Sequence, residues 1–283
     1  MSEGDTIRYL STRIGAALAG QRCVRCVTRD PRLVGVDLVG SVLRTADAFG
    51  KHLFVEFDDV VLHAHLGMTG SIAVSRPISG PAWKRRIELG MEHGSLVGYN
   101  VPILGITDRH GAQAIISQLG PDLCGSVAPE ASLIVDRLRQ SPEMPLAAAI
   151  LDQRIWAGFG NVYAIELPFI AGICPTTPIG AIDDLDLLVR LGIGIIRYNA
   201  TTGMHNTTGK KLREDDRFIF GGRGGLCPIC GSRLDGFRER ESPWQRQSVW
   251  CTSCQTPTNR VADRTRIRQL TSLHPGRIRE APQ

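Results

Sequence analysis

The sequence predicts a multidomain α+β protein, in which a strand-rich first part is followed by helices and then by a small cysteine hairpin. Strand-like runs with short turns fill the first 120 residues, a helical pattern follows from Gly120, and two Cys-x-x-Cys pairs lie near the end. We therefore expect four regions: an antiparallel β-sandwich with a leading helix (1–120), a helix-two-turns-helix domain (121–216), a four-cysteine finger (217–257) and a basic tail (258–283).

The leading helix is expected from about residue 4 to Gly20. Its apolar positions recur at helical spacing and form one stripe: Ile7, Leu10, Ile14 and Leu18. We expect Asp5 or Thr6 to cap its start. A buried helix so close to the chain start would hold the terminus against the protein body. Because Ser2 is small, we expect Met1 to be removed, which leaves the α-amine of Ser2 as the mature N-terminus.

Short β-prone runs separated by turns follow this helix. The expected strands are Cys23–Val27, Leu33–Val36, Leu53–Phe57, Val60–Leu66, Ser71–Val74, Leu96–Tyr99, Ile103–Thr107 and Gln113–Ile116. Several strands joined by short turns, such as the one at Asp58-Asp59, with only one helix, indicate a two-layer antiparallel sandwich. Cys23 and Cys26 have metal-ligand spacing, but on a strand they point to opposite faces, so we interpret them as sheet residues.

Helical patterns begin after Gly120. The expected helices are 129–140 (with Leu133, Ile134 and Leu138 facing inward), 145–151, 162–171 and 183–199. Between the second and the third, the segment 152–161 is a glycine-punctuated double turn that leads into a helix N-terminus. Such turns expose backbone N–H groups that suit a DNA phosphate, although helical hairpins with glycine turns are common. A polar loop, 201–216, leads into the finger.

The strongest single signal is the pair of Cys-x-x-Cys motifs, formed by Cys227, Cys230, Cys251 and Cys254. Two such knuckles close a tetrahedral four-sulfur site of the kind that Zn²⁺ prefers. The intervening hairpin is too small to bury a core, and the metal would supply the missing folding free energy. An iron site of the rubredoxin kind and a redox dithiol pair fit the spacing less well. Four protein ligands leave no open position, so the zinc is expected to be structural.

Charge and composition restrict the possible functions. No apolar run approaches the roughly 18 residues that a membrane helix needs, and no signal-peptide pattern opens the chain, so we expect a bacterial cytoplasmic protein. From Arg217 onward there are twelve Arg, no Lys and five acidic residues, a net charge of +7, which leaves −2 for the rest. Arginine concentrated around a zinc hairpin favours a phosphate-binding surface, and the alternative is a solvated basic tail, especially over 264–279.

Five sequence segments, in this order, resemble those of the formamidopyrimidine-DNA glycosylase/endonuclease VIII family. They are Ser2-Glu3-Gly4-Asp5-Thr6, Gly50-Lys51-His52-Leu53, His65-Leu66-Gly67-Met68-Thr69-Gly70, the stretch 151–164 with Gly158-Phe159-Gly160-Asn161-Val162-Tyr163-Ala164, and the finger ending Trp250-Cys251-Thr252-Ser253-Cys254-Gln255. The resemblance spans residues 1 to about 257. The opening is similar to the endonuclease VIII type, whereas Leu-Gly-Met resembles the formamidopyrimidine branch.

The resemblance implies a DNA glycosylase with AP-lyase activity that removes oxidised bases in base excision repair. It implies that the amine of Ser2 forms a Schiff base with the damaged nucleotide, that Glu3 is the general acid/base, and that Lys51 contacts a phosphate and assists catalysis. Without the resemblance, Glu3 reads as an acid in a first helical turn and Lys51 as a solvated turn lysine. The opening motif fits oxidised pyrimidines, while oxidised purines and abasic sites stay open.

Ser2 departs from the family pattern, because the family has proline at this position. A primary amine can still form an imine with the opened sugar. Attack by the Ser2 hydroxyl is an alternative, and retention of Met1 would leave no amine in place. A non-catalytic relative that binds damaged DNA is therefore the second hypothesis, and an iron-binding electron carrier is the third.

The resemblance also implies how the DNA is held. Asn161 and Arg246 are the expected phosphate clamp, and Met68 is the expected wedge that fills the gap left by the flipped nucleotide. The alternative readings are a capping asparagine and a core methionine. The segment 108–111 offers Arg109 but no Phe for the formamidopyrimidine branch's second wedge. The expected partner is damaged double-stranded DNA bound by a monomer; the hairpin 234–245 has no assigned role.

Overall fold

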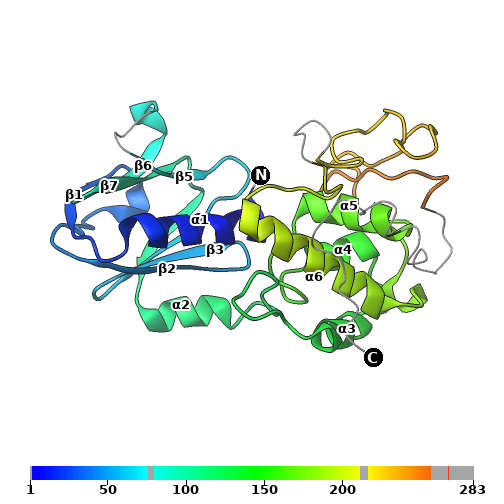
Figure 1. Cartoon of the computed structure of the whole chain (residues 1–283), viewed down its shortest axis with the longest axis horizontal. Helices are drawn as coiled ribbons and strands as arrows, with labels where there is room; N and C mark the ends of the chain where they lie inside the picture. Colours follow the sequence, from blue (N-terminus) through cyan, green and yellow to red (C-terminus); the bar gives the residue numbers. More distant parts are fainter. Residues whose placement is uncertain (1, 76–79, 211–215, 256–266, 268–283) are drawn as a thin grey trace. The chain divides into compact units, whose positions relative to one another are not determined.

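The computed structural model describes residues 2–75, 80–210, 216–255 and 267 of the 283-residue chain (Figure 1). The chain divides into two compact units, Met1–Leu119 and Gly120–Gln283, which are described separately. The further division of the second unit into a helical domain, a finger and a tail stays a prediction. The tail expected at 258–283 lies outside the described residues except for Ile267.

The first unit is a sandwich of two four-stranded sheets whose pairs are all antiparallel, as the sequence predicts. One sheet has the order β1-β6-β7-β5, formed by Cys23–Thr28, Arg85–Met91, Gly94–Tyr99 and Ser71–Val74. The other has the order β2-β3-β4-β8, formed by Leu43–Phe49, His52–Phe57, Val61–His65 and Ile103–Thr107. Leu53, Val55 and Phe57 alternate along β3 and lie in the core between the sheets with no exposed surface.

Helix α1 (Gly4–Leu18) runs along β2 and β3 (Figure 1). Ile7, Ile14 and Leu18 are fully buried, which confirms the predicted stripe, and each contributes roughly 1.5–3 kcal/mol of burial free energy. The cap prediction is wrong, because the N-cap residue is Glu3 rather than Asp5 or Thr6.

Two predicted strands are wrong. Residues 33–36 begin in a 3₁₀ turn, η1 (Pro31–Leu33), and continue without a strand, because Asp30 accepts the Arg32 backbone N–H and Pro31 favours a turn start. Residues 113–116 lie in helix α2 (Arg109–Ile116), where Asp108 Oδ1 accepts the Gly111 N–H at 2.7 Å. Strands β2 and β6 were not predicted, and a second short 3₁₀ turn, η2 (Ala82–Lys84), precedes β6.

Cys23 and Cys26 both lie on β1, as expected for sheet residues. They do not face opposite sides, because a bulge shifts the register of β1 against β6 between Cys23 and Arg25. Both thiols therefore pack against the sandwich core. Burial raises the pKa of Cys23 to about 11, which makes it an inert core residue.

The second unit has four α-helices among its described residues: α3 (Ala131–Arg139), α4 (Leu146–Leu151), α5 (Asn161–Ala171) and α6 (Leu185–Thr202), with a 3₁₀ turn η3 (Ile179–Ala181). They surround one hydrophobic core in which Trp156 and Phe159 of the double turn are fully buried. In α3 the inward residues are Ile134, Val135 and Leu138; Leu133, predicted inward, is 54% exposed.

The cysteine-rich segment after α6 has little regular structure and is held by short bridges, Leu226↔Arg233 and Asp235↔Trp250. Its apolar residues Ile219, Leu234 and Val249 share a small core with α5. Within the described part of the chain, no helix is long and apolar enough to cross a membrane.

Candidate functional site

The start of α1 places a small residue directly before two buried carboxyl groups. Ser2 is half-buried, while Glu3 and Asp5 are 1% and 0% exposed. Asp5 Oδ1 accepts the Thr6 N–H at 2.6 Å, and the Glu3 carbonyl begins the helical ladder by accepting the Ile7 N–H at 3.0 Å. Burial of Glu3 exceeds what a solvated first-turn acid would show, so the arrangement suits a carboxyl group held beside a reacting centre.

The hairpin between β2 and β3 brings Lys51 to the same end of the sandwich unit. The guanidinium of Arg8, in the second turn of α1, donates to Asp47 and to the carbonyl of Ala48, at the end of β2. Lys51 follows two residues beyond that strand and is half-buried. The predicted catalytic residues therefore lie in two parts of the sandwich unit that Arg8 connects. Ser2 and Glu3 lie at the start of α1, and Lys51 lies in the hairpin between β2 and β3.

A row of imidazoles lies next to Lys51 and was missed by the sequence analysis. His52 stacks on His63 with ring centroids 5.1 Å apart and Nδ1···Nε2 at 2.9 Å, and His65 meets the edge of His52. Phe54 stacks on His63 and ends the row. The sequence did contain a signal for this row. The aromatic and histidine residues recur at every second position on two strands expected to be neighbours, so their side chains share one face.

The imidazole row is electrically neutral. Burial, and then the charges of His65, His63 and Lys51, lower the pKa of His52 to about 4. Burial also lowers the pKa values of His63 and His65. At neutral pH the imidazoles beside Lys51 are therefore uncharged and act as hydrogen-bonding and packing groups.

Met68 lies at the tip of a rigid turn after β4 and is 61% exposed, so the core-methionine reading is wrong. Gly67 has φ +57° and donates its N–H to His65 Nδ1 at 3.2 Å, and Gly70 donates to the Leu66 carbonyl at 2.9 Å. A Cβ on Gly70 would lie 2.4 Å from the Leu66 oxygen, so only glycine fits there. An exposed apolar tip on such a turn can act as a wedge.

Asn161 is the first residue of α5 in the second unit and is 7% exposed. Gly160 occupies the N-cap position, so capping does not account for this asparagine. Its Oδ1 is buried without a hydrogen-bond partner among the described residues. The double turn before it is braced by Gln153, which donates to the Leu151 and Phe159 carbonyls and accepts the Gly158 N–H.

The four predicted metal ligands come together. The sulfur atoms of Cys227, Cys230, Cys251 and Cys254 lie within 4.8 Å of one another. Two of the distances, 3.8 Å for Cys227–Cys254 and 3.5 Å for Cys230–Cys251, are close to the roughly 3.8 Å that a tetrahedral site with Zn–S bonds of ~2.3 Å requires. The donor set and its geometry therefore fit one tetrahedral metal ion.

Arg246 is exposed on the finger, between the two knuckles. It follows Gln245, whose φ of +53° is unusual for a residue other than glycine. Its guanidinium forms an ion pair with Glu239 at 3.3 Å and donates to the Gln245 carbonyl.

Glu166 of α5, which the sequence analysis did not single out, connects this helix to the finger. Its fully buried carboxylate accepts the Thr207 hydroxyl and the N–H groups of 218–220, each at 2.5–2.7 Å.

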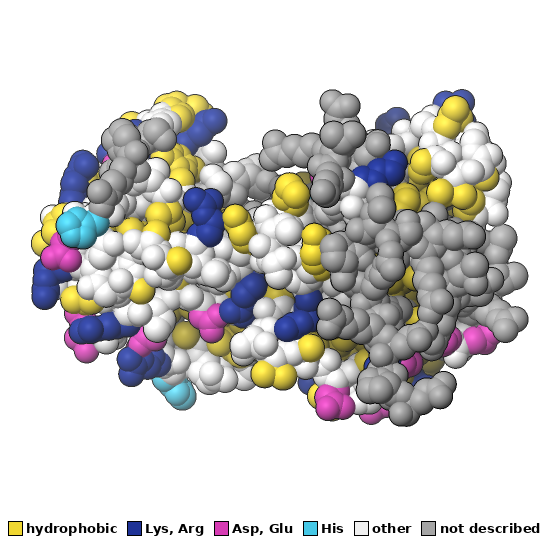
Figure 2. Space-filling model, in the orientation of Figure 1, with side chains coloured by type: hydrophobic (Ala, Val, Ile, Leu, Met, Phe, Trp, Pro, Cys, Tyr) yellow, Lys and Arg dark blue, Asp and Glu magenta, His cyan; other side chains and the backbone are white. Residues whose placement is uncertain are grey.

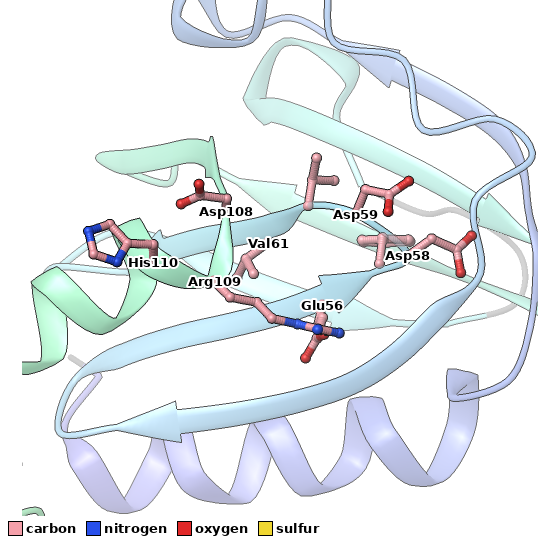
Figure 3. A pocket seen from close by; sticks show the side chains of 9 residues that line it. Glu56, Asp58, Asp59, Val61, Asp108, Arg109 and His110 are labelled. Carbon is pink, nitrogen blue, oxygen red and sulfur yellow. The ribbon is translucent and has the colours of Figure 1, made fainter.

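Arg109, the other arginine considered for a wedge, is engaged elsewhere. It forms an ion pair with Glu56 beside a pocket of about 260 Å³ that is also lined by Asp58, Asp59 and Asp108 (Figure 3). Glu56 neutralises this guanidinium, and the carboxylates of Asp59 and Asp108 also line the pocket, which disfavours a DNA phosphate there.

The chain is similar to known proteins over most of its length. The model of the formamidopyrimidine-DNA glycosylase N-terminal domain matches residues 1–101. The DNA-(apurinic or apyrimidinic site) lyase Nei2 of Mycolicibacterium smegmatis is 35% identical, with 90% of this chain and 99% of the relative covered. The probable endonuclease 8 2 of Streptomyces coelicolor is 36% identical over 95% and 99% of the two chains. The fold also matches Lactococcus lactis formamidopyrimidine-DNA glycosylase bound to DNA containing an AP site, with a TM-score of 0.76, 20% identity and coverage of 90% and 99%.

Proposed function

Because the chain belongs to the formamidopyrimidine-DNA glycosylase/endonuclease VIII family, we propose that it is a bifunctional DNA glycosylase and AP lyase. Its substrate is damaged double-stranded DNA, with oxidised pyrimidines as the preferred lesions, and it works as a monomer on the bacterial chromosome in the cytoplasm. The observation that carries the proposal is the start of the chain: Ser2 directly precedes the buried Glu3 at the N-terminus of a helix fixed to the Lys51 hairpin.

Removal of Met1 supplies the nucleophile. An α-amine has an ordinary pKa of about 7.7–8.0, and the positive end of the helix dipole disfavours its protonated form. The neutral nitrogen of Ser2 bonds to C1′ of the flipped nucleotide while the bond from C1′ to the damaged base breaks, and the departing base takes up a proton. Glu3 protonates the ring oxygen as the sugar opens, and loss of the second amine proton leaves the imine.

Strand cleavage follows from the imine. Loss of a C2′ proton and departure of the 3′ phosphate break the C3′–O bond by β-elimination. Lys51, Asn161 and Arg246 are the proposed phosphate ligands, since their side chains offer an ammonium, an amide and a guanidinium. Met68 fills the gap left by the flipped nucleotide. Zn²⁺ is the proposed ion of the four-cysteine cluster, where it stabilises the finger that carries Arg246.

Borohydride trapping tests the reaction, because the reductant converts the imine into a permanent link between protein and DNA. The wild-type protein is expected to be trapped on abasic-site and oxidised-pyrimidine duplexes. Ser2→Ala keeps an α-amine and is expected to be trapped as well, which separates amine attack from hydroxyl attack. Glu3→Gln is expected to lose base removal from the oxidised duplex while still binding it. No trapped wild-type complex, with Met1 absent by mass spectrometry, would leave only a non-catalytic DNA-binding protein.

A further inference from the structure

A second cavity of about 550 Å³ lies in the sandwich unit. Four turns or strand ends form it, and they come from distant parts of the sequence. Its lining residues are Asp30, Pro31, Arg32, Thr69, Arg86, Asn100, Val101 and Pro102. The cavity is open to solvent and lies wholly within one compact unit, so its walls have fixed relative positions.

One of its two arginines is structural. Arg32 donates to both carboxylate oxygens of Asp30 at 2.7 Å and to the carbonyls of Val101 and Pro102. The hydrogen bonds from Arg32, and then the charges of Arg32 and Arg86, lower the pKa of Asp30, which stays ionised and balances one of the two arginine charges. Together these hydrogen bonds connect the turn after β1 to the turn between β7 and β8.

The other arginine, Arg86, is available to bind a ligand. Arg86 lines the same cavity, and no carboxylate lies within ion-pair distance of its guanidinium in the part of the chain that the structure describes. The cavity therefore has one positive charge in excess, next to the hydroxyl of Thr69 and the amide of Asn100. A guanidinium with two neutral donors is the chemistry that recognises a phosphate.

The position of the cavity indicates where that phosphate comes from. Thr69 follows Met68 directly, and the turn that carries Met68 packs on Pro102, since a Cβ on Gly67 would come within 2.8 Å of that proline. A ligand in the cavity is thus a close neighbour of whatever Met68 contacts. If Met68 enters a DNA duplex, the adjacent backbone passes over Thr69 and Asn100.

The surface beside the cavity also carries groups that suit a nucleic acid. The Asn100 N–H donates to the Lys84 carbonyl at 2.8 Å, which places η2 at the rim. The indole of Trp83 is 73% exposed, and the Lys84 ammonium lies 4.9 Å from its centroid. On the face that Figure 2 shows, Lys and Arg side chains of the sandwich unit are interspersed with apolar and acidic groups. Exposed aromatic and basic groups together are typical of nucleic-acid surfaces.

We propose that this cavity is an additional phosphodiester subsite, in which Arg86, Thr69 and Asn100 bind the DNA backbone next to the nucleotide gap that Met68 fills. It is separate from the Lys51, Asn161 and Arg246 ligands, and it rests on the proposed function. It extends the footprint of the sandwich unit on the duplex and fixes the backbone beside the wedge. Free inorganic phosphate shares the same chemistry, so the test includes both sources.

The test measures binding of an abasic-analogue duplex by Arg86→Gln over a series of salt concentrations. Loss of one phosphate contact is expected to reduce the slope of log K against log salt by about 0.9 and to weaken binding about three- to tenfold near 0.1 M salt. Arg86→Lys keeps the charge and is expected to keep the slope. Arg13→Gln removes an exposed arginine of α1 that contacts Tyr9, and it is the matched control, expected to change neither quantity.

Three outcomes would overturn the subsite. Equal slopes for Arg86→Gln and Arg13→Gln, with wild-type protein trapped normally by borohydride, would remove the subsite and leave the proposed function standing. Thermal stabilisation of wild type but not Arg86→Gln by 10 mM (roughly physiological) inorganic phosphate, with unchanged duplex binding, would assign the cavity to a free anion instead. Failure of the wild type to bind the duplex at all would remove both proposals together.

Discussion

Arg246, the proposed phosphate ligand of the finger, is already paired with a carboxylate. Glu239 comes from the hairpin 234–245, to which the sequence assigns no role, and its Oε1 lies 3.3 Å from the Arg246 guanidinium. Both side chains are about half exposed, so the pair contributes only ~0.2–1 kcal/mol, and a DNA phosphate can displace it. The hairpin thus adds a weak competitor for DNA at this residue.

Glu239→Gln is therefore expected to tighten duplex binding about two- to fivefold at low salt, and the gain should shrink as salt rises. Glu241→Gln removes an equal charge from the same hairpin, where Glu241 accepts the Arg238 N–H, and it is the control. Arg246→Ala should weaken binding in either background. Equal affinity of the two Gln variants would show that the ion pair does not compete with DNA.

His52 predicts a pH dependence of stability. Its folded-state pKa is about 4, below the ordinary 6.5, so folding favours the neutral imidazole. The stability that this contributes is fully present above pH 6.5 and is lost as pH falls from 6.5 towards 4. His52→Phe keeps the ring stack without a titrating group, and its Tm should fall less between pH 7 and pH 5 than that of wild type. His93→Gln, at an exposed histidine, is expected to follow the wild-type curve.

At the scale of elements, periodicity identified the helices and strands whose buried faces were uninterrupted, and failed where polar groups were buried. Strand β6 was missed because Glu88, 1% exposed and paired with Arg29 and Arg85, interrupts its apolar pattern. The last predicted strand, 113–116, lies in α2, because a run of four residues is too short to distinguish the apolar period of a strand (2) from that of a helix (3.6). The Asp108 cap favours the helix. The cysteine cluster was predictable because two Cys-x-x-Cys motifs define it, whereas the exposed position of Met68 followed only from the family resemblance.

Glu166 determines how α5 and the finger are joined. Replacing it with Ala leaves three backbone N–H groups of residues 218–220 buried without an acceptor, at ~1–3 kcal/mol each. Glu166→Ala is expected to lower the unfolding free energy by several kcal/mol (about the sum of such losses) in urea denaturation. Asp186→Ala removes an exposed partner of Arg190 on α6 and should change it by less than about 0.5 kcal/mol. Similar losses in both variants would contradict the role of this carboxylate.

At the scale of the whole molecule, the sandwich unit and the finger depend on different sources of stability. The sandwich has a continuous apolar core, whereas the finger has few buried side chains beyond its cysteines. The sequence predicted both because core and ligand patterns are local. The spacing of His52, His63 and His65 on two predicted neighbouring strands was visible in the sequence. That Glu166 accepts N–H groups more than fifty residues away could not be predicted, since it depends on the final packing.

Removal of the metal should therefore unfold the finger and leave the sandwich unit folded. A strong chelator is expected to release about one zinc ion per chain (the stoichiometry of a Cys₄ site) and to abolish duplex binding, while most β-sheet circular dichroism remains. Zinc added back should restore binding. Retention of full DNA affinity by metal-free protein would contradict the structural role of the ion.

The exposed thioether of Met68 has a chemical consequence for a protein that meets oxidised DNA. Hydrogen peroxide converts an accessible methionine into its sulfoxide, which would place a strong dipole on the tip that we propose enters the apolar base stack. The oxidants that create the lesions would then lower the activity of the protein that removes them. Met68→Leu should keep most of its activity after peroxide treatment under conditions that inactivate the wild type, and equal inactivation of both would place the sensitive group elsewhere.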